Sequence, residues 1–196
     1  MASGGVTPYD PGMQTALILI DIQDSFRHRP SWSDAELPRM LDRTGELIRG
    51  AGERGVPIVR VLHEDPGDAQ NPFSAASGHV RPLAGLADFV PALELTKHRH
   101  SALAGTVLPI WLRSQGIRRL IVAGIRTEQC CETTTRHASD EGFDVDYVTE
   151  ATLTFAMKRL DGTPMAPRDI MAHAEAVLAG RFATICTVGQ ALERAG

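Results

Sequence analysis

Three residue types that support covalent catalysis stand where expected strands end. Asp21 directly follows the apolar run 16–20, Lys97 follows a short stretch at 93–96, and Cys130 lies in the turn after the run 120–123. A thiol can act as a nucleophile, and a nearby carboxylate can accept and return its proton. An ammonium can hold both groups and tune their charge. These residues predict nucleophilic catalysis by a cysteine.

Cys130 stands near the start of a helix that we expect over residues 127–141. The positive end of the helix dipole and a nearby Lys97 ammonium would both favour a thiolate over a thiol. We therefore expect Cys130 to be a nucleophile near neutral pH, with Asp21 relaying its proton to a departing nitrogen. Cys131 and Cys186 are interpreted as buried structural thiols.

Three segments together resemble the signature segments of the isochorismatase-like cysteine hydrolases. They are Ile20-Asp21-Ile22-Gln23-Asp24-Ser25-Phe26, Lys97 ahead of Ser101-Ala102-Leu103, and Gly124-Ile125-Arg126-Thr127-Glu128-Gln129-Cys130. Each segment is a weak signal alone, but their order and spacing over the whole domain are specific. The resemblance implies a three-layer α/β/α sandwich with a six-stranded parallel sheet, and a catalytic triad of Asp21, Lys97 and Cys130.

The resemblance also implies a reaction and its supporting groups. Main-chain N–H groups of Arg126 and Cys130 would form an oxyanion hole, with a cis peptide bond between Ile125 and Arg126. The implied reaction cleaves a C–N bond of a small amide, carbamoyl or ureido substrate through a Cys130 thioester. Ammonia or an amine would leave, and water would then release a carboxylate.

Five further residues are expected to contact the substrate: Gln23, Phe26, His63, Glu128 and Phe155. Alternatives remain open for three of them, because His63 suits a surface histidine, Glu128 suits the start of a helix, and Phe155 suits the core. The Arg126 side chain either recognises a substrate carboxylate or is an exposed or interface arginine.

Neither a metal nor a cofactor is expected. Nicotinamidase relatives carry an Asp-x-His element followed by another histidine after the second strand. Here the corresponding residues are 61–63, and Val61 stands where the carboxylate ligand would be needed. Glu64, Asp65 and His79 lie downstream, but we expect catalysis to be independent of a metal.

The elements that must position these residues alternate along the chain. We expect strands at 16–20, 57–62, 93–96, 120–123, 143–148, 151–153 and 182–188, and helices at 33–55, 101–115, 127–141 and 166–178. Residues 65–83 predict a long loop that shapes the site. This alternation predicts right-handed βαβ units around a parallel sheet, whose ligands bind beyond the carboxyl ends of the strands.

The amino-acid composition limits the classes of binding partner that we expect. The 196 residues carry a formal net charge of −4 and suit one domain over residues 15–196 after a tail at 1–14. We expect no nucleic-acid partner, since no overall basic field is present, and no membrane partner, since no run approaches about 20 apolar residues. The opening residues Met1-Ala2-Ser3-Gly4-Gly5 show no basic stretch followed by an apolar run, so we expect a cytoplasmic protein. The three cysteines do not suggest a disulfide framework. The resemblance implies a homo-oligomer.

Two other functions stay open at this point. An isochorismatase-type enzyme cleaves a vinyl ether with the aspartate as acid and needs no cysteine nucleophile, so an intact Cys130 argues against it. A binding or redox-sensing protein could use Cys130 and Cys131 as an oxidisable pair, but Asp21 and Lys97 would then be unexplained.

Overall fold

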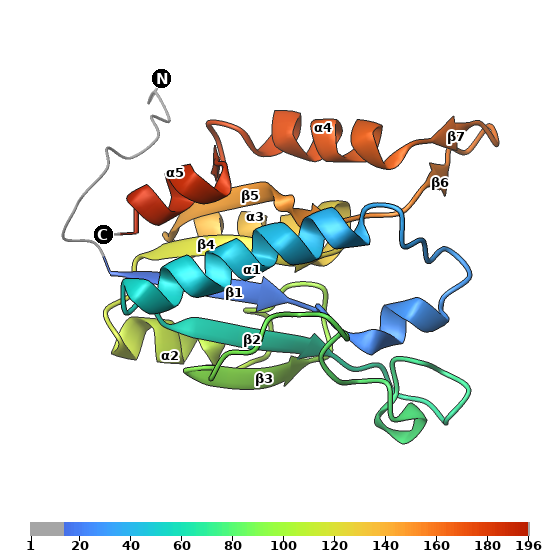
Figure 1. Ribbon diagram of the computed structural model, residues 1–196, viewed down its shortest axis with the longest axis horizontal. Coiled ribbons are helices and arrows are strands. Elements are labelled where there is room, and N and C mark those ends of the chain that lie inside the picture. The colour runs from blue at the N-terminus through green and yellow to red at the C-terminus, as the bar shows by residue number, and fades with distance from the viewer. Residues whose placement is uncertain (1–13, 196) are drawn as a thin grey trace.

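The computed structural model describes residues 14–195, so the expected tail lies outside the described residues except for Gln14. Its centre is a six-stranded parallel sheet in the order β3-β2-β1-β4-β5-β8 (Figure 1). The strands are β1 (Thr15–Ile20), β2 (Ile58–His63), β3 (Leu93–Lys97), β4 (Arg119–Ile125), β5 (Asp144–Leu153) and β8 (Thr184–Ile185). The predicted α/β fold is confirmed.

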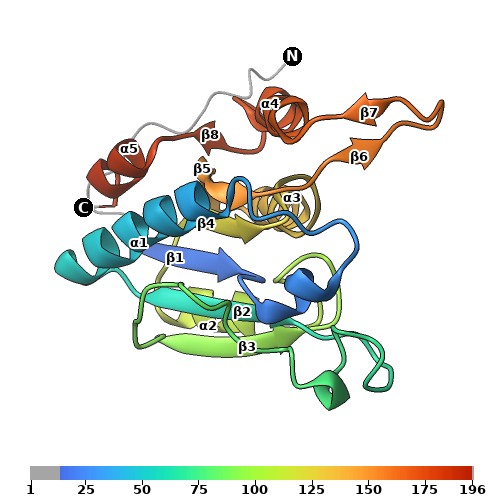
Figure 2. The ribbon, with the colours of Figure 1, turned by 45° about the vertical axis from the view of Figure 1, so that its right-hand side comes forward.

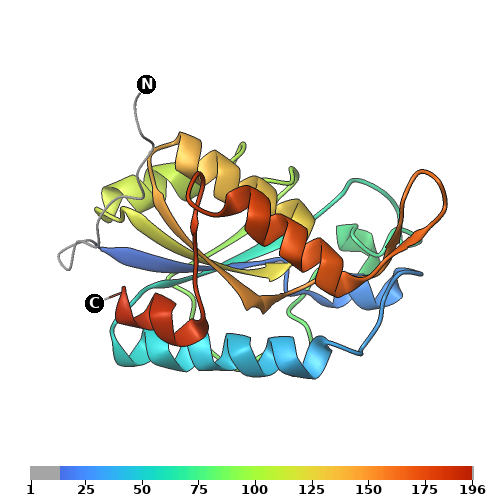
Figure 3. The same cartoon turned by 90° about the horizontal axis from the view of Figure 1, so that it is seen from above.

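Helices cover both faces of the sheet, which makes three layers. They are α1 (Leu37–Glu53), α2 (Leu108–Ser114), α3 (Glu132–Asp140), α4 (Pro167–Leu178) and α5 (Val188–Glu193). Figure 3 shows α1 and α5 on one side of the sheet and α2, α3 and α4 on the other. Across residues 14–195, none of the helices combines the length and the apolar character that crossing a bilayer requires.

Alternation along β1 explains how the layers are held together. Ile18 and Ile20 belong to the core beneath α2 and α3, whereas Leu17 and Leu19 belong to the core beneath α1. All six residues of the strand are buried, as expected for a central parallel strand covered on both faces. Because β1 pairs with β2 and β4, the chain segments that follow these strands meet at one edge of the sheet.

Short elements gather at this carboxyl edge. They are η1 (Asp24–His28) and η2 (Ala75–Ser77), the π-helical turn η3 (Thr127–Cys131), and a hairpin of β6 (Met157–Lys158) and β7 (Pro164–Met165). Figure 2 shows η1, η2 and the hairpin extending from the same edge of the sheet. Residues 65–83 form the predicted long loop, interrupted only by η2.

The helix expected over 101–115 is shorter than predicted, because α2 begins only at Leu108. The Ser101 hydroxyl accepts a hydrogen bond from the Leu103 N–H, and the Thr106 hydroxyl donates one to the Ala102 carbonyl. Gly105 has a φ of 71°, in the left-handed region. These side-chain bonds and this backbone conformation replace the helical pattern.

The carboxyl-terminal part of the chain differs from the prediction in two ways. The strands expected at 143–148 and 151–153 form one strand, β5, whose register against β4 shifts between Val122 and Gly124. The strand expected at 182–188 is only β8, and α5 begins directly after it. Thr187 and Gln190 cap α5 with reciprocal side-chain hydrogen bonds, and this Thr-x-x-Gln signal is present in the sequence.

Candidate active site

The carboxyl edge of the sheet brings together four reactive side chains from four strands or the turns that follow them. Asp21 follows β1, His63 ends β2, Lys97 ends β3, and Cys130 lies in η3 after β4. This is the place where open parallel sheets bind ligands. The structure therefore joins residues that are separated by more than a hundred positions in the chain.

Lys97 is the hub of the cluster and is completely buried. Its Nζ lies 2.8 Å from Asp21 Oδ2, 3.1 Å from His63 Nδ1 and 3.4 Å from Cys130 Sγ. An ammonium has three N–H groups, so these three neighbours match its capacity to donate. Burial alone would lower the pKa of Lys97, but the Asp21 carboxylate and Cys130 outweigh it and raise the pKa. Lys97 is therefore a fixed cation.

Asp21 is held beside Lys97 by an unusual backbone. Its φ is 51°, a left-handed conformation that costs energy for a residue other than glycine, and its N–H donates to the Val61 carbonyl at 2.8 Å. Burial raises the pKa of Asp21, although the Lys97 ammonium acts in the opposite direction. The Lys97 ammonium lies within ion-pair distance of one carboxylate oxygen, and the Cys130 thiol also interacts with the carboxylate. The Asp21 carboxylate is therefore placed between a cation and a thiol.

Gly124 lets β1 and β4 approach closely just before the site. Its φ is 136°, and a Cβ there would lie 2.0 Å from the Ile20 carbonyl oxygen. Only glycine avoids that clash, which would involve backbone rather than a flexible side chain. Gly124 thus sets the spacing between the strands that lead to Asp21 and to Cys130.

Cys130 is buried, and its environment corrects the expectation of a resting thiolate. Burial and the Asp21 carboxylate together raise the pKa of Cys130 to about 12, despite the opposing effect of the Lys97 ammonium. At neutral pH Cys130 is therefore a thiol. Ionisation of Cys130 near neutral pH would require a base, and the Asp21 carboxylate lies beside the thiol.

The turn that carries Cys130 is fixed by hydrogen bonds. The Arg126 carbonyl accepts from the N–H groups of Gln129 and Cys131, and the buried Tyr147 hydroxyl donates to the Thr127 carbonyl at 2.7 Å. The peptide bond between Ile125 and Arg126 is cis, as the resemblance implied. The main-chain N–H groups expected to form an oxyanion hole, those of Arg126 and Cys130, belong to this rigid turn.

His63 lines the site and has a defined protonation state. Its Nδ1 faces the Lys97 ammonium and must accept, so its Nε2 carries the proton and donates to Asp65 Oδ1 at 2.8 Å. Burial, followed by the Lys97 charge, lowers the pKa of His63. His63 is thus a neutral imidazole that orients Lys97.

Gln23, expected to bind substrate, instead holds the backbone of His63. Its Oε1 accepts from the His63 N–H at 2.7 Å, and its Nε2 donates to the His63 carbonyl at 2.9 Å. The side chain is completely buried and does not line the cavity. Gln23 therefore joins the segment after β1 to the end of β2.

A cavity of about 300 Å³ opens onto the thiol. It is lined by Asp21, Phe26, Arg29, Ser31, His63, Asp65, Phe73, His100, Arg126, Gln129 and Cys130. Of the residues expected to contact substrate, Phe26 and His63 are among them. Arg29, Ser31 and Phe73 were not predicted from the sequence, because they reach the site only through the fold of two loops.

Glu128 and Phe155 are not among the residues that line the cavity. Glu128 accepts a hydrogen bond from the Thr154 hydroxyl at 2.6 Å and forms an ion pair with Arg126 at 2.9 Å. Phe155 is buried and packs near Phe26, with ring centroids 6.3 Å apart. Both residues support the walls, and the charge of Arg126 is neutralised by Glu128.

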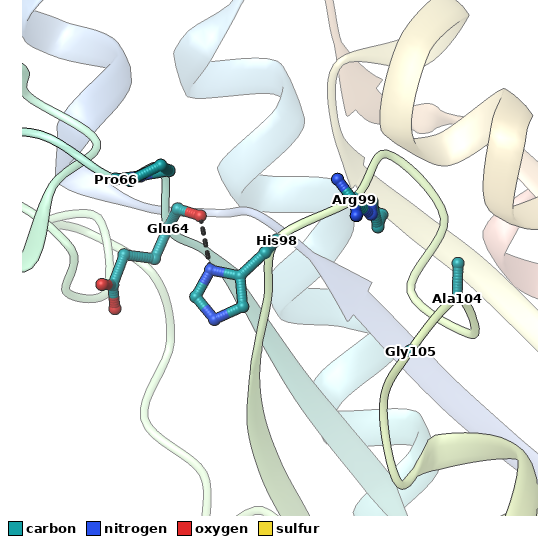
Figure 4. A pocket seen from close by; sticks show the side chains of 6 residues that line it. All are labelled: Glu64, Pro66, His98, Arg99, Ala104 and Gly105. Atoms are coloured by element: carbon teal, nitrogen blue, oxygen red, sulfur yellow. Dashed lines mark hydrogen bonds between the residues drawn. The ribbon is translucent and has the colours of Figure 1, made fainter.

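A second cavity of about 450 Å³ lies outside this cluster. It is lined by Glu64, Pro66, His98, Arg99, Ala104 and Gly105 (Figure 4). His98 Nδ1 donates to the Glu64 carbonyl at 2.8 Å, which fixes the loop after β3. The larger cavity therefore contains no member of the Asp21, Lys97 and Cys130 cluster.

Among residues 14–195, one group of side chains has the spacing of metal ligands. It differs from the residues that the sequence analysis compared with a nicotinamidase metal site. It consists of Asp24, His28 and His79. Asp24 Oδ2 lies 3.6 Å from His28 Nε2 and 3.4 Å from His79 Nδ1, but it also pairs with Arg81 at 2.9 Å. The two imidazole rings are stacked 23° from parallel, with centroids 3.6 Å apart. Nearly parallel rings cannot both direct a lone pair at one ion, so these residues do not fit a metal as they stand.

Comparison with known proteins agrees with this geometry. A family model described as the isochorismatase domain matches residues 15–188. Nicotinamidase 3 of Arabidopsis thaliana is 41% identical over 184 residues, which cover 84% of this chain and 89% of that protein. Streptothricin hydrolase of Streptomyces noursei is 28% identical over 172 residues, or 86% of this chain and 57% of that protein.

A solved structure shows the same fold. The crystal structure of a cysteine hydrolase from Pseudomonas syringae matches with a TM-score of 0.84 at 20% identity, and the match covers 100% of this chain and 98% of the other. The extent of the family match and the identity to the plant relative agree with the strand order and the cluster at the carboxyl edge. The chain belongs to the isochorismatase family of hydrolases.

Proposed function

We propose that this hydrolase cleaves the C–N bond of a small amide, carbamoyl or ureido compound through a thioester on Cys130. The observation that carries the proposal is the contact of the buried Lys97 ammonium with both Asp21 and Cys130, beside a cavity of about 300 Å³. A nucleophile, a base and a fixed cation then surround one reacting atom. The name of the plant relative, a nicotinamidase, supports an amide as the substrate.

The first half of the cycle forms the thioester. Asp21 accepts the thiol proton as Cys130 Sγ attacks the carbonyl carbon, because the raised pKa of Cys130 keeps the proton on sulfur until then. Main-chain N–H groups of Arg126 and Cys130 receive the developing oxyanion. The protonated Asp21 then donates its proton to the nitrogen, the C–N bond breaks, and ammonia or an amine leaves.

The second half regenerates the thiol. Water enters the vacated position, and the Asp21 carboxylate accepts a proton from it as the water oxygen attacks the thioester carbon. The C–S bond breaks, Cys130 recovers its proton from Asp21, and the product leaves as a carboxylic acid that ionises in water. Lys97 keeps its charge throughout and stabilises each anionic form of its neighbours.

Ammonia release from a panel of small primary amides and ureides tests the proposal. We expect turnover by the wild-type protein, undiminished after dialysis against a chelator, and a loss of more than about a thousandfold in Cys130→Ala. Cys131→Ala is the matched control, since Cys131 is a neighbouring buried thiol outside the cavity. Ammonia release that survives Cys130→Ala would exclude the thioester route. Loss with chelator that zinc restores would overturn metal independence.

A further inference from the structure

Two arginines, Arg29 and Arg126, line the cavity that contains Cys130. Within the described part of the chain, only Arg126 has a carboxylate partner. Arg126 forms an ion pair with Glu128 at 2.9 Å, and both side chains are largely buried. Arg29 is exposed, and within residues 14–195 no carboxylate lies within ion-pair distance of it. The cavity therefore presents one guanidinium whose charge is not neutralised by a direct partner.

An aromatic shelf holds this guanidinium at the cavity. The Arg29 Cζ lies 4.8 Å from the centroid of the Phe73 ring, and Phe73 is itself packed edge-on against Phe26 at 4.9 Å. Stacking on a ring leaves the N–H groups in the plane of the guanidinium free to donate. Turn hydrogen bonds also fix the backbone, from the Arg29 N–H to the Phe26 carbonyl and from the Trp32 N–H to the Arg29 carbonyl, both at 3.0 Å.

The other basic side chains of the site are already engaged by neighbouring residues, so Arg29 is the cation that can pair with a bound anion. Lys97 is completely buried, is absent from the cavity wall, and is surrounded by Asp21, His63 and Cys130. His63 is held neutral between Lys97 and Asp65. Ser31 adds a hydroxyl to the same wall as Arg29, and none of the described residues hydrogen-bonds to that hydroxyl.

We infer that Arg29, with Ser31, binds a carboxylate of the substrate, so that the preferred substrate is an amide or ureide that also carries a carboxylate group. This inference rests on the proposed function of the same site. A guanidinium fork matches the two oxygens of a carboxylate. Asp65 also lines the cavity and adds a negative charge, which favours a singly charged carboxylate over a phosphate dianion.

Matched substrates test this assignment. Succinamate and succinamide have the same chain length and differ only in a carboxylate against a second amide. We expect the wild-type protein to have the higher kcat/KM for succinamate, and Arg29→Gln to lower the ratio of the two values at least about tenfold, mainly through KM. Arg29→Lys keeps the charge but loses the fork, so it should retain part of the ratio.

Arg99→Gln is the matched control, because Arg99 is an arginine of the second cavity in Figure 4 and its replacement removes the same charge. Its ratio should equal that of the wild-type protein. An unchanged ratio in Arg29→Gln, or a wild-type preference for succinamide, would overturn the inference while leaving amide hydrolysis intact.

A binding measurement tests the role of Arg29 independently of amide hydrolysis. In a Cys130→Ala background, calorimetry with succinamate should give an affinity at least about tenfold weaker when Arg29 is replaced by Gln. Equal affinities would contradict the assignment whether or not any amide is hydrolysed. Inorganic phosphate that displaces succinamate and binds more tightly would contradict the choice of a carboxylate.

Discussion

Lys97 Nζ lies 2.8 Å from Asp21 Oδ2, and both side chains are completely buried. Removing two charges from water is costly, and a buried ion pair rarely improves stability over apolar residues of the same size. The pair is therefore better explained by what it does to the adjacent Cys130. The carboxylate raises the pKa of the thiol and the ammonium lowers it.

Opposite effects of Asp21→Asn and Lys97→Met on the thiol follow from this arrangement. Asp21→Asn removes the negative charge that opposes ionisation, so alkylation of Cys130 by iodoacetamide at pH 8 should become faster. Lys97→Met removes the stabilising cation, so alkylation should become slower. A change of one pKa unit alters the thiolate fraction about tenfold.

Both variants should lose hydrolysis, because one lacks the base and the other lacks the cation. Peptide mass spectrometry of Cys130 in a Cys131→Ala background measures the alkylation rates. If both substitutions shifted the rate in the same direction, the opposing roles assigned to Asp21 and Lys97 would be incorrect.

The pH dependence of kcat/KM should show an acid limb. Asp21 must be ionised to accept the thiol proton, and burial raises its pKa above the usual 3.8. Activity should therefore rise with pH through a midpoint above 3.8, and protonation of His63 would add to the loss on the acid side. A profile that stays flat down to pH 4, in a protein that remains folded there, would contradict the role of Asp21 as base.

His63 is expected to act through Lys97 as a positioning residue. His63→Leu removes the acceptor at Nδ1, which should lower kcat about tenfold or more, on the scale of one lost hydrogen bond to a charged group. His63→Gln offers an amide oxygen to Lys97 and should recover part of kcat. Equal activities of the Leu and Gln variants would show that the hydrogen bond to Lys97 is unimportant.

Gly124→Ala should destabilise the fold by about 3 kcal/mol or more, because its Cβ would clash with the Ile20 carbonyl oxygen. Gly142→Ala is the control, since Gly142 also has a positive φ, of 85°, but a Cβ there would have no atom within 4 Å beyond its chain neighbours. It should cost only about 1–2 kcal/mol. Urea unfolding of both variants measures the difference, and equal losses would contradict the close approach of β1 and β4.

The parallel sheet and the reactive cluster could be predicted because local signals agreed with the fold. The apolar run before Asp21 is typical of a strand covered on both faces, and strand ends are where α/β proteins place ligands. The shortened helix α2 could not be read from apolar spacing, since Ser101 and Thr106 compete for backbone hydrogen bonds. Helix α5 was not predicted, although the cap at Thr187 that starts it is a signal in the sequence.

The residues that form the site could be predicted more readily than their protonation states and individual roles. In the sequence, the nearness of Cys130 to a helix start and to Lys97 indicated a thiolate. Burial of the Cys130 thiol raises its pKa, and that burial can be known only from the packed structure. The hydrogen bonds that Gln23 makes to the His63 backbone were not predictable, because they join residues 40 positions apart. Arg29 reaches the cavity through a turn that carries no periodic pattern.

Intact mass spectrometry of acid-quenched mixtures with a slowly hydrolysed amide tests the central claim most directly. The thioester mechanism predicts a mass increase equal to the substrate less ammonia, located on Cys130, absent from Cys130→Ala and unaffected in Cys131→Ala. Ammonia release without any such adduct, or with an adduct on another residue, would contradict nucleophilic catalysis by Cys130.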